Sequence, residues 1–312
     1  MARAFLFPGQ GSQAVGMGKA LGENFPQARA VYAEIDDALG ASLSTLMFEG
    51  PEAELTLTAN AQPGLMAVSL AAIRVLEAEA GLDLSRDAAF VSGHSLGEYS
   101  ALAAAGAFTI ADTARLLRLR GQAMQAAVPV GEGAMAALLG VELDAAREIA
   151  ESAAQGAVCQ VANDNGGGQI VVSGARAAVE RAIEIAKQRG VKRAVPLPVS
   201  APFHCALMQP AADAMRAALA TTAIAAPKVP VVANVTAAPV TEPEEIRRLL
   251  VEQVTGTVRW RECVAFMADQ GVDKFVECGA GKVLTGLLKR IAPAAQGLAV
   301  GAPADLDAYR GF

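Results

Sequence analysis

The sequence predicts an α/β protein in which a large parallel sheet carries a smaller inserted unit. Two continuous apolar runs, residues 2–7 (ARAFLF) and 88–93 (AAFVSG), are each followed by a turn and then by a helical pattern. Continuous apolar strands that alternate with helices are typical of a parallel sheet with both faces covered. Between residues 128 and 200 the segments become shorter and follow a different order, which indicates a second unit.

The elements of the large sheet follow from this pattern in chain order. Residues 2–7 are expected to form a buried strand, and residues 8–13 (PGQGSQ) a turn that leads into a helical stretch. The second strand, at residues 88–93, ends in a sharp turn before another helix. Two more strands of this sheet are predicted later in the chain, with a loop at residues 237–245 between them: residues 229–235 (VPVVANV) and 274–279 (KFVECG).

The inserted unit is predicted to have the order βαββαβ, which is the ferredoxin-like pattern. Residues 161–169 (VANDNGGGQ) supply the hairpin turn between its two central strands. We therefore expect a ferredoxin-like subdomain at residues 128–200. Residues 1–127 and 201–312 are expected to form one large discontinuous domain.

Composition restricts the functional classes. A net charge of -6 disfavours generic binding to nucleic acid, which usually needs clustered Lys and Arg. The apolar segments are all shorter than the roughly 18 residues that a membrane span requires, and the N-terminus lacks the features of a signal peptide. The sequence therefore predicts a cytoplasmic protein. The four cysteines form no CxxC pair, which argues against a zinc site or a disulfide framework.

Residues 93–97 (GHSLG) match the pattern G-x-S-x-G, in which a serine occupies the sharp turn between a strand and a helix. Because α/β hydrolases have the same turn, we expect the large domain to be hydrolase-like. Gly93 and Gly97 allow the tight turn, so Ser95 is predicted to be a nucleophile at a helix N-terminus, and the backbone N–H of Leu96 a donor to an oxyanion. The alternative is a strand-to-helix turn with no catalytic role.

A serine nucleophile usually needs an imidazole base, and the chain has two histidines. His94 directly precedes Ser95 at the end of a strand, where neighbouring side chains point to opposite faces, so it is expected to brace the turn. His204 lies on a connection after Pro202 and is therefore the predicted base. The alternative for His204 is a histidine held by local hydrogen bonds alone.

Arg120 is the candidate for binding an anion. Residues 111–128 have helical period, and Arg115, Arg118 and Gln122 form a polar stripe on that helix. Arg120 is expected on the opposite, apolar side. A buried guanidinium there can bind a substrate carboxylate through two hydrogen bonds. An internal salt bridge to Asp or Glu is an equally good explanation.

These segments together resemble the malonyl-CoA:acyl-carrier-protein transacylase family along nearly the whole chain. The matching segments, in the family's order, are FPGQGSQ (7–13), GHSLGEYSAL (93–102), LRGQAMQ (119–125), GAM (133–135), VANDN (161–165), PFHCALM (202–208), VVANV (231–235), the region around Gln253 and Trp260, and CGAGKVLTGLLKRI (278–291). The last of these has Ala280 where the family often has proline, at what is expected to be a surface turn.

The resemblance implies a role for each candidate. Ser95 and His204 would form a catalytic dyad, with Gln10 and Leu96 supplying the N–H groups of the oxyanion hole. Arg120 would bind the malonyl carboxylate. Gln253 would orient His204 through its main-chain carbonyl, in place of the acidic member of a triad. The residues expected around the substrate are therefore Arg120, Gln253 and His94.

The resemblance also implies a reaction. The enzyme would be an [acyl-carrier-protein] S-malonyltransferase that moves a malonyl group from malonyl-CoA to the phosphopantetheine thiol of acyl carrier protein by a ping-pong mechanism. Its product would supply chain-extender units for fatty-acid synthesis. Both thioesters are substrates, so no cofactor is implied, and the expected state is a monomer.

Three alternatives are weaker. An α/β hydrolase shares the G-x-S-x-G turn, but it usually places an acidic residue before the histidine and has no need of a buried arginine. Residues 9–14 (GQGSQA) fit a dinucleotide-binding turn, but the acidic residues that follow, Glu34, Asp36 and Asp37, lie in a helical pattern. A non-catalytic binding module would not need Ser95, His204 and Arg120 together.

Overall fold

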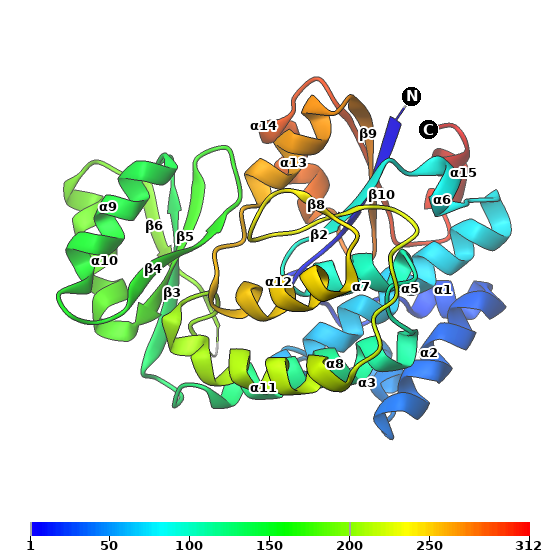
Figure 1. The fold of residues 1–312 in the computed structure, drawn as a ribbon, viewed down its shortest axis with the longest axis horizontal. Coiled ribbons are helices and arrows are strands. Elements are labelled where there is room, and N and C mark those ends of the chain that lie inside the picture. The colour runs from blue at the N-terminus through cyan, green and yellow to red at the C-terminus, as the bar shows by residue number, and fades with distance from the viewer. Residues whose placement is uncertain (1, 200) are drawn as a thin grey trace.

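The computed structural model describes residues 2–199 and 201–312, which form two sheets with helices around them (Figure 1). The larger sheet has six strands in the order β10-β9-β1-β2-β7-β8. Five of these strands run parallel, whereas β8 is antiparallel to β7. The expected parallel sheet is therefore a mixed sheet. Its strands are β1 (Ala2–Phe7), β2 (Phe90–Gly93), β7 (Val231–Val232), β8 (Pro239–Val240), β9 (Val272–Cys278) and β10 (Gln296–Val300).

Strand β1 shows why the first apolar run is continuous. It pairs with β2 on one side and with β9 on the other, so it is a central strand. Ala4 and Leu6 belong to the core cluster that includes α13 and α14, whereas Phe5 and Phe7 belong to the cluster on the other face. All four side chains are fully buried. Because helices cover both faces of the strand here, the four positions from Ala4 to Phe7 are all apolar, whereas Arg3 lies at its half-buried start.

The helices outside the smaller sheet's segment pack mainly around the larger one. They are α1 (Lys19–Asn24), α2 (Pro26–Leu39), α3 (Leu43–Glu49), α4 (Glu52–Leu55), α5 (Thr58–Ala80), α6 (Leu84–Asp87), α7 (Leu96–Ala104), α8 (Ile110–Ala126), the 3-10 turn η1 (Ala206–Met208), α11 (Gln209–Thr221), α12 (Pro243–Thr255), α13 (Trp260–Asp269), α14 (Val283–Ile291) and α15 (Asp305–Arg310). Among the helices that the structure describes, none combines the length and apolarity needed to cross a bilayer.

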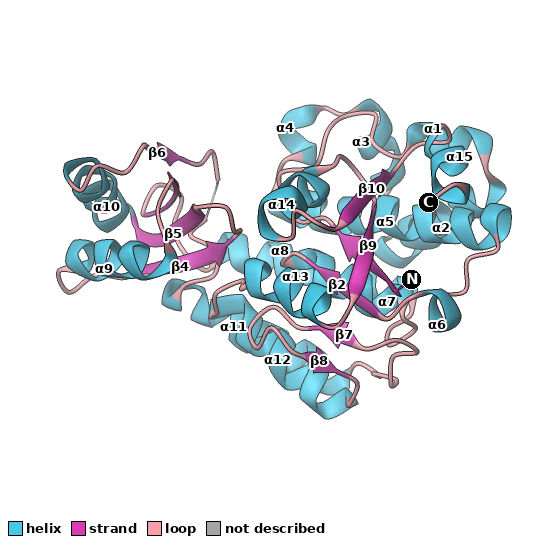
Figure 2. Cartoon of the chain, turned by 90° about the horizontal axis from the view of Figure 1, so that it is seen from above, coloured by secondary structure: helices cyan, strands magenta, loops and turns pink. Residues whose placement is uncertain are grey.

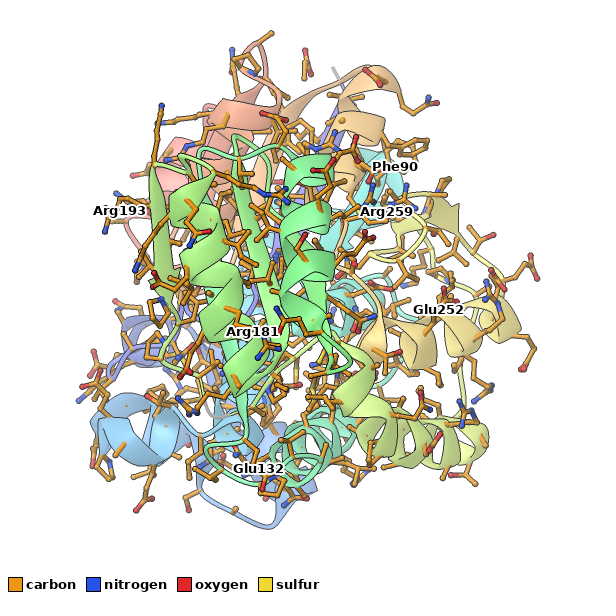
Figure 3. All side chains as sticks on the ribbon, turned by 90° about the vertical axis from the view of Figure 1, so that its left-hand side faces the viewer. Phe90, Glu132, Arg181, Arg193, Glu252 and Arg259 are labelled. Atoms are coloured by element: carbon orange, nitrogen blue, oxygen red, sulfur yellow. The ribbon has the colours of Figure 1, made fainter. Side chains whose placement is uncertain are left out.

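The smaller sheet is antiparallel, with the strand order β4-β5-β3-β6. Its elements follow the predicted βαββαβ order: β3 (Gly133–Leu139), α9 (Leu143–Ala154), β4 (Cys159–Asp164), β5 (Gln169–Ala175), α10 (Arg176–Gln188) and β6 (Arg193–Pro196). Helices α9 and α10 cover the face turned away from the larger sheet (Figures 1 and 2). Arg181 joins them by donating to the carbonyl oxygens of Ala153 and Ala154 (Figure 3). The predicted last residue of this unit, Ser200, lies outside the described residues.

Two expectations about the C-terminal third are wrong, and one strand is new. Residues 237–245 are not a plain loop, because β8 forms there and Pro243 begins α12 at a position where a missing N–H costs nothing. Ala280 is buried rather than on a surface turn. Strand β10, QGLAV, was not predicted, since it is a short edge strand that contains glycine and so gives a weak β signal.

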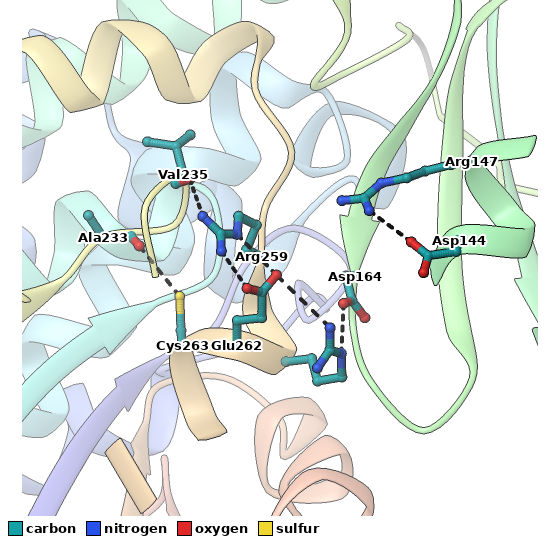
Figure 4. Close-up of polar contacts among 9 residues, drawn as sticks. Asp144, Arg147, Asp164, Ala233, Val235, Arg259, Glu262 and Cys263 are labelled. Atoms are coloured by element: carbon teal, nitrogen blue, oxygen red, sulfur yellow. Dashed lines mark hydrogen bonds and ion pairs between the residues drawn. The ribbon is translucent and has the colours of Figure 1, made fainter. Parts of the chain in front are cut away.

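The two sheets are joined close to the loop that follows β4. Val258 and Asn163 form an isolated parallel bridge, in which Asp164 N donates to Val258 O at 3.0 Å. Asp164 is buried and accepts from Arg261 Nε at 2.8 Å. Figure 4 shows Asp164 beside the Arg259–Glu262 pair at the start of α13. These contacts fix the position of Asn163 and Asn165 against the larger sheet.

Candidate active site

Ser95 lies at the sharp turn between β2 and α7, which depends on two close backbone approaches. Its backbone has φ 55° and ψ -110°, a conformation that costs energy in a residue with a side chain. A Cβ atom on Gly93 would lie 1.9 Å from the Gly97 carbonyl oxygen, and one on Gly97 would lie 2.2 Å from the Phe7 carbonyl oxygen. Only glycine fits at both positions, so the turn presents Ser95 at the N-terminus of α7.

Asn234 closes this turn from the neighbouring strand. Its Oδ1 accepts from Ser95 N at 2.8 Å, and its Nδ2 donates to the Gly93 carbonyl oxygen at 2.8 Å. Asn234 is fully buried just after β7. It is absent from the predicted site. The signal that could have found it is an asparagine at the end of an apolar strand, where a buried amide needs polar partners.

His204 reaches Ser95 from a loop far along the chain. Its Nε2 lies 2.8 Å from Ser95 Oγ, and its Nδ1 lies 2.9 Å from the Gln253 carbonyl oxygen. Because a carbonyl oxygen only accepts, Nδ1 carries the proton, and Nε2 is left to accept from the Ser95 hydroxyl. His204 is buried and has φ 57°, so its backbone is also held in a strained conformation.

The surroundings of His204 favour the neutral imidazole. Burial, together with the positive charge of Arg120, lowers the pKa of His204 to about 3. The imidazole is therefore unprotonated at neutral pH and is free to take a proton from a hydroxyl.

Arg120 lies on α8 and is one of the largest fully buried side chains that the structure describes, with 1% of its surface exposed. Its NH1 donates to Gln62 Oε1 at 2.7 Å. Its NH2 donates to Ser95 Oγ at 3.1 Å and to Gln253 Oε1 at 3.0 Å. The guanidinium carbon lies 5.6 Å from the centre of the Tyr99 ring. The guanidinium thus lies next to the Ser95 hydroxyl.

The partners of Arg120 leave its charge available. All three acceptors are neutral, and Nε has no hydrogen-bond partner in the described part of the chain. The alternative predicted for this residue, an internal salt bridge to Asp or Glu, does not occur among residues 2–199 and 201–312. A buried guanidinium that lacks an anionic partner is suited to bind one from a ligand.

Close packing places Arg120 at this depth. A Cβ atom on the next residue, Gly121, would lie 2.6 Å from the Thr58 carbonyl oxygen and 2.6 Å from Ala59 Cα. The glycine therefore lets α8 approach the first turn of α5. Gln62, four residues after Thr58 on α5, is brought to the guanidinium by the same approach.

The residues expected to stabilise an oxyanion lie in the same cavity as Ser95, which has a volume of about 560 Å³. Leu96 is the first residue of α7, where the N–H has no acceptor within the helix. The Gln10 side chain is held by Thr58, with Nε2 donating to Oγ1 at 3.2 Å. The cavity is lined by Gln10, Gly11, Gln13, Ala53, Thr56, Leu57, Gln62, His94, Ser95, Leu96, Arg120, Met124, Met135, Asn163, Leu197, Pro198, Val199, Phe203 and His204.

His94 and Gln253 occupy different places around this cavity. His94 lines it and is bound to the smaller sheet's loop, with Nε2 2.9 Å from Asn165 Oδ1. Burial lowers the pKa of His94. Gln253 lies on α12 and is fully buried behind Ser95, where its Nε2 donates to the Ser95 carbonyl oxygen at 3.0 Å. Gln253 therefore contacts Ser95, His204 and Arg120 together.

Gln62 and Glu98 also belong to this network and were not predicted. Glu98 follows Ser95 by three residues and accepts from Gln253 Nε2 at 2.9 Å. Burial raises the pKa of Glu98 to about 7, against the lowering effect of its hydrogen bonds and of Arg120. A glutamate in the first turn of a helix whose other residues are all uncharged, LGEYSALAA, is the signal that could have identified it.

The low pKa of His204 predicts the pH dependence of kcat/KM for malonyl-CoA. Activity requires the unprotonated imidazole, so it falls only as pH drops through the pKa of the free enzyme. We expect kcat/KM to change less than about threefold from pH 7 to 5, whereas a histidine with the ordinary pKa of about 6.5 would lose about 25-fold over that range. Steady-state kinetics over this interval tests it, and a steep decline beginning near pH 6.5 would contradict it. Glu98→Gln is the control, because Glu98 itself titrates in this range.

Comparisons with known proteins agree with this geometry. The model of the acyl transferase domain family matches residues 4–300. A malonyl CoA-acyl carrier protein transacylase of Bacillus subtilis is 46% identical over 305 residues, which are 97% of this chain and 95% of the relative. The crystal structure of an acyl-carrier-protein S-malonyltransferase from Bartonella henselae is 58% identical, with a TM-score of 0.97 and full coverage of both chains.

A further solved structure contains a carrier protein. It is a type II polyketide acyl-carrier protein in complex with its malonyl-transacylase, to which this chain is 42% identical with a TM-score of 0.96, covering 100% of this chain and 99% of that one. The similarity therefore extends over the whole chain and includes both sheets. The chain belongs to the acyl transferase family and, within it, to the malonyl-CoA:acyl-carrier-protein transacylases.

Proposed function

We propose that this protein moves a malonyl group from malonyl-CoA to the phosphopantetheine thiol of acyl carrier protein, through a malonyl ester on Ser95. The observation that carries the proposal is the position of Ser95 Oγ, which lies 2.8 Å from His204 Nε2 and 3.1 Å from Arg120 NH2 in one cavity. A base and a cation that meet at one hydroxyl suit an acyl group that has a free carboxylate. The product supplies chain-extender units for fatty-acid synthesis.

In the first half-reaction Ser95 Oγ attacks the thioester carbonyl carbon, and His204 Nε2 takes the hydroxyl proton. The backbone N–H groups of Gln10 and Leu96 donate to the oxyanion that forms. The carbon–sulfur bond then breaks, and His204 returns the proton to the sulfur of coenzyme A as it leaves. The products are free coenzyme A and malonyl-Ser95.

The second half-reaction reverses these roles. The phosphopantetheine thiol of the carrier protein gives its proton to His204 and attacks the ester carbonyl carbon. The bond to Ser95 Oγ breaks, and the oxygen regains a proton from His204. Each half-reaction ends before the next substrate binds, so the kinetics are ping-pong.

The other residues fix the substrate and the base. Arg120 binds the malonyl carboxylate and so selects acyl groups that have one, while Gln253 orients His204 through its carbonyl oxygen. Two observations support the second role: the 2.9 Å contact with Nδ1 and the burial of both residues. His94 is assigned to the substrate side of the cavity, where it braces the turn through Asn165.

We also propose how the chain divides. Residues 1–127 and 201–312 form the large domain, which is hydrolase-like in its strand, nucleophile turn and helix. Residues 128–200 form a ferredoxin-like subdomain, a proposal supported by the antiparallel order β4-β5-β3-β6. Five buried residues of this segment nevertheless belong to the core cluster of the large sheet: Val128, Met135, Ala137, Ala162 and Val171. The monomeric state, the cytoplasmic location and the absence of a cofactor stay predictions.

The proposal is tested by separating transfer from hydrolysis. The protein is incubated with malonyl-CoA, with and without holo acyl carrier protein, and both malonyl-carrier protein and free malonate are measured. We expect malonyl-carrier protein to form in proportion to coenzyme A released, with little malonate in either reaction. Malonate as the main product in both reactions would contradict transfer and favour the hydrolase alternative.

A further inference from the structure

Glu98 is a buried carboxylic acid that neither half-reaction uses. It lies on the first turn of α7, with 2% of its surface exposed. Its Oε2 accepts from Asn234 N at 2.9 Å and from Gln253 Nε2 at 2.9 Å. Carboxylates are rarely buried to this extent unless their hydrogen bonds offset the free-energy cost of removing them from water. The position of this group therefore calls for an explanation.

The two partners of Glu98 are the residues that hold the reacting groups. Asn234 binds the backbone of the Ser95 turn on both sides, at Ser95 N and at the Gly93 carbonyl oxygen. Gln253 reaches Ser95 O through Nε2, Arg120 NH2 through Oε1 and His204 Nδ1 through its carbonyl oxygen. One carboxylate oxygen thus joins the two residues that support the hydroxyl, the imidazole and the guanidinium.

The hydrogen bonds between Glu98, Gln253 and Arg120 run in a fixed direction. An ionised carboxylate only accepts and a guanidinium only donates. The Gln253 amide lies between them, with its NH₂ toward Glu98 and its oxygen toward Arg120. Without an acceptor at position 98, the Asn234 N–H and one N–H of Gln253 would lose their buried partner. Both residues would then be free to shift.

The charges of Arg120 and Glu98 also favour this arrangement. The three hydrogen-bond acceptors of Arg120 are neutral, and the electrostatic interaction of Arg120 with Glu98 favours the ionised carboxyl group. Among the described residues, Glu98 also contributes to the raised pKa of two buried groups beside it, Tyr99 and Cys263. In its ionised form the Glu98 carboxyl group therefore offsets the charge of the buried guanidinium while no substrate carboxylate is bound.

We propose that Glu98 is a positioning residue of this site, which holds Gln253 and Asn234 and thereby sets Arg120, His204 and Ser95 relative to one another. The proposal rests on the proposed function, because it assigns Arg120 to the malonyl carboxylate. Glu98 itself touches no reacting atom. Its removal should therefore affect the choice of acyl group as well as the rate.

The test compares acylation by malonyl-CoA and by acetyl-CoA in three variants. Glu98→Met has similar length but lacks a carboxylate acceptor, and we expect kcat/KM to fall at least about tenfold more for malonyl-CoA than for acetyl-CoA. Glu98→Gln keeps an acceptor oxygen, so kcat/KM for malonyl-CoA should stay within about fivefold of the original protein. Glu98→Ala also lacks a hydrogen-bond acceptor, and it replaces Glu98→Met in the test if that variant does not fold.

Glu277→Gln is the matched control. Glu277 is also fully buried, and it accepts from Leu284 N, Thr285 N and Thr285 Oγ1 at the start of α14. Its replacement should lower Tm without changing the malonyl-to-acetyl ratio. A merely structural Glu98 would behave in the same way, so an unchanged ratio in Glu98→Met, or in Glu98→Ala, would overturn the proposal. Failure of the proposed function would instead show in the original protein, as the absence of malonyl transfer.

Discussion

Replacing Ser95 with alanine is expected to abolish the release of coenzyme A from malonyl-CoA, with a loss on the order of 10⁴-fold or more. Alanine has no oxygen to attack the thioester, so the malonyl ester cannot form. The second half-reaction, which starts from that ester, cannot occur either. The remaining cavity can still bind substrate through Arg120. The measurement is the appearance of the free coenzyme A thiol, followed with a thiol-reactive dye.

Ser100 supplies the control on the same helix. It is fully buried, and its hydroxyl has no hydrogen-bond partner among the described residues, so Ser100→Ala should keep close to full activity. Coenzyme A release by Ser95→Ala at a rate near that of the Ser100 variant would show that another group attacks the thioester.

Replacing Arg120 with alanine is expected to reduce kcat/KM for malonyl-CoA by about 100-fold or more, the amount typical of a lost charge-assisted pair. The effect on acetyl-CoA should be less than about tenfold, because acetyl has no carboxylate to bind. The loss is therefore selective. Acylation rates with the two thioesters, measured on the same preparation, test the difference.

Arg118→Ala is the matched variant, since Arg118 lies on the same helix but donates to Asn60 and does not line the cavity. It should leave the ratio of the two rates unchanged. Equal losses with malonyl-CoA and acetyl-CoA in Arg120→Ala would mean that Arg120 only supports the fold around Ser95.

Much of the fold could be predicted because it depends on local patterns. The continuous apolar runs of β1 and β2 predict parallel strands covered on both faces, and the order of segments after residue 128 predicts the smaller sheet. The predictions fail where local signals are weak. Strand β10 is a short edge strand, and β8 has two residues, one of them a proline.

Some residues of the site could likewise be predicted from the sequence, and others could not. Ser95 is marked by its flanking glycines, and the scarcity of histidines leaves His204, so both could be proposed from the chain alone. The signals of Glu98 and Asn234, a glutamate in the first turn of a helix and an asparagine after a strand, are weaker. They name no partner, because the partners are set by tertiary contacts between residues more than 130 positions apart. The hydrogen bonds that hold a site together depend on which strands become neighbours, and a linear sequence does not state this.

The attachment of the malonyl group to Ser95 Oγ is best tested by mapping the modified peptide. The protein is mixed briefly with malonyl-CoA, quenched in acid, digested and analysed by tandem mass spectrometry. We expect a malonyl ester on Ser95 that disappears when holo acyl carrier protein is added before the quench. A malonyl group on any other residue, or transfer to the carrier protein while Ser95 stays unmodified throughout turnover, would contradict it.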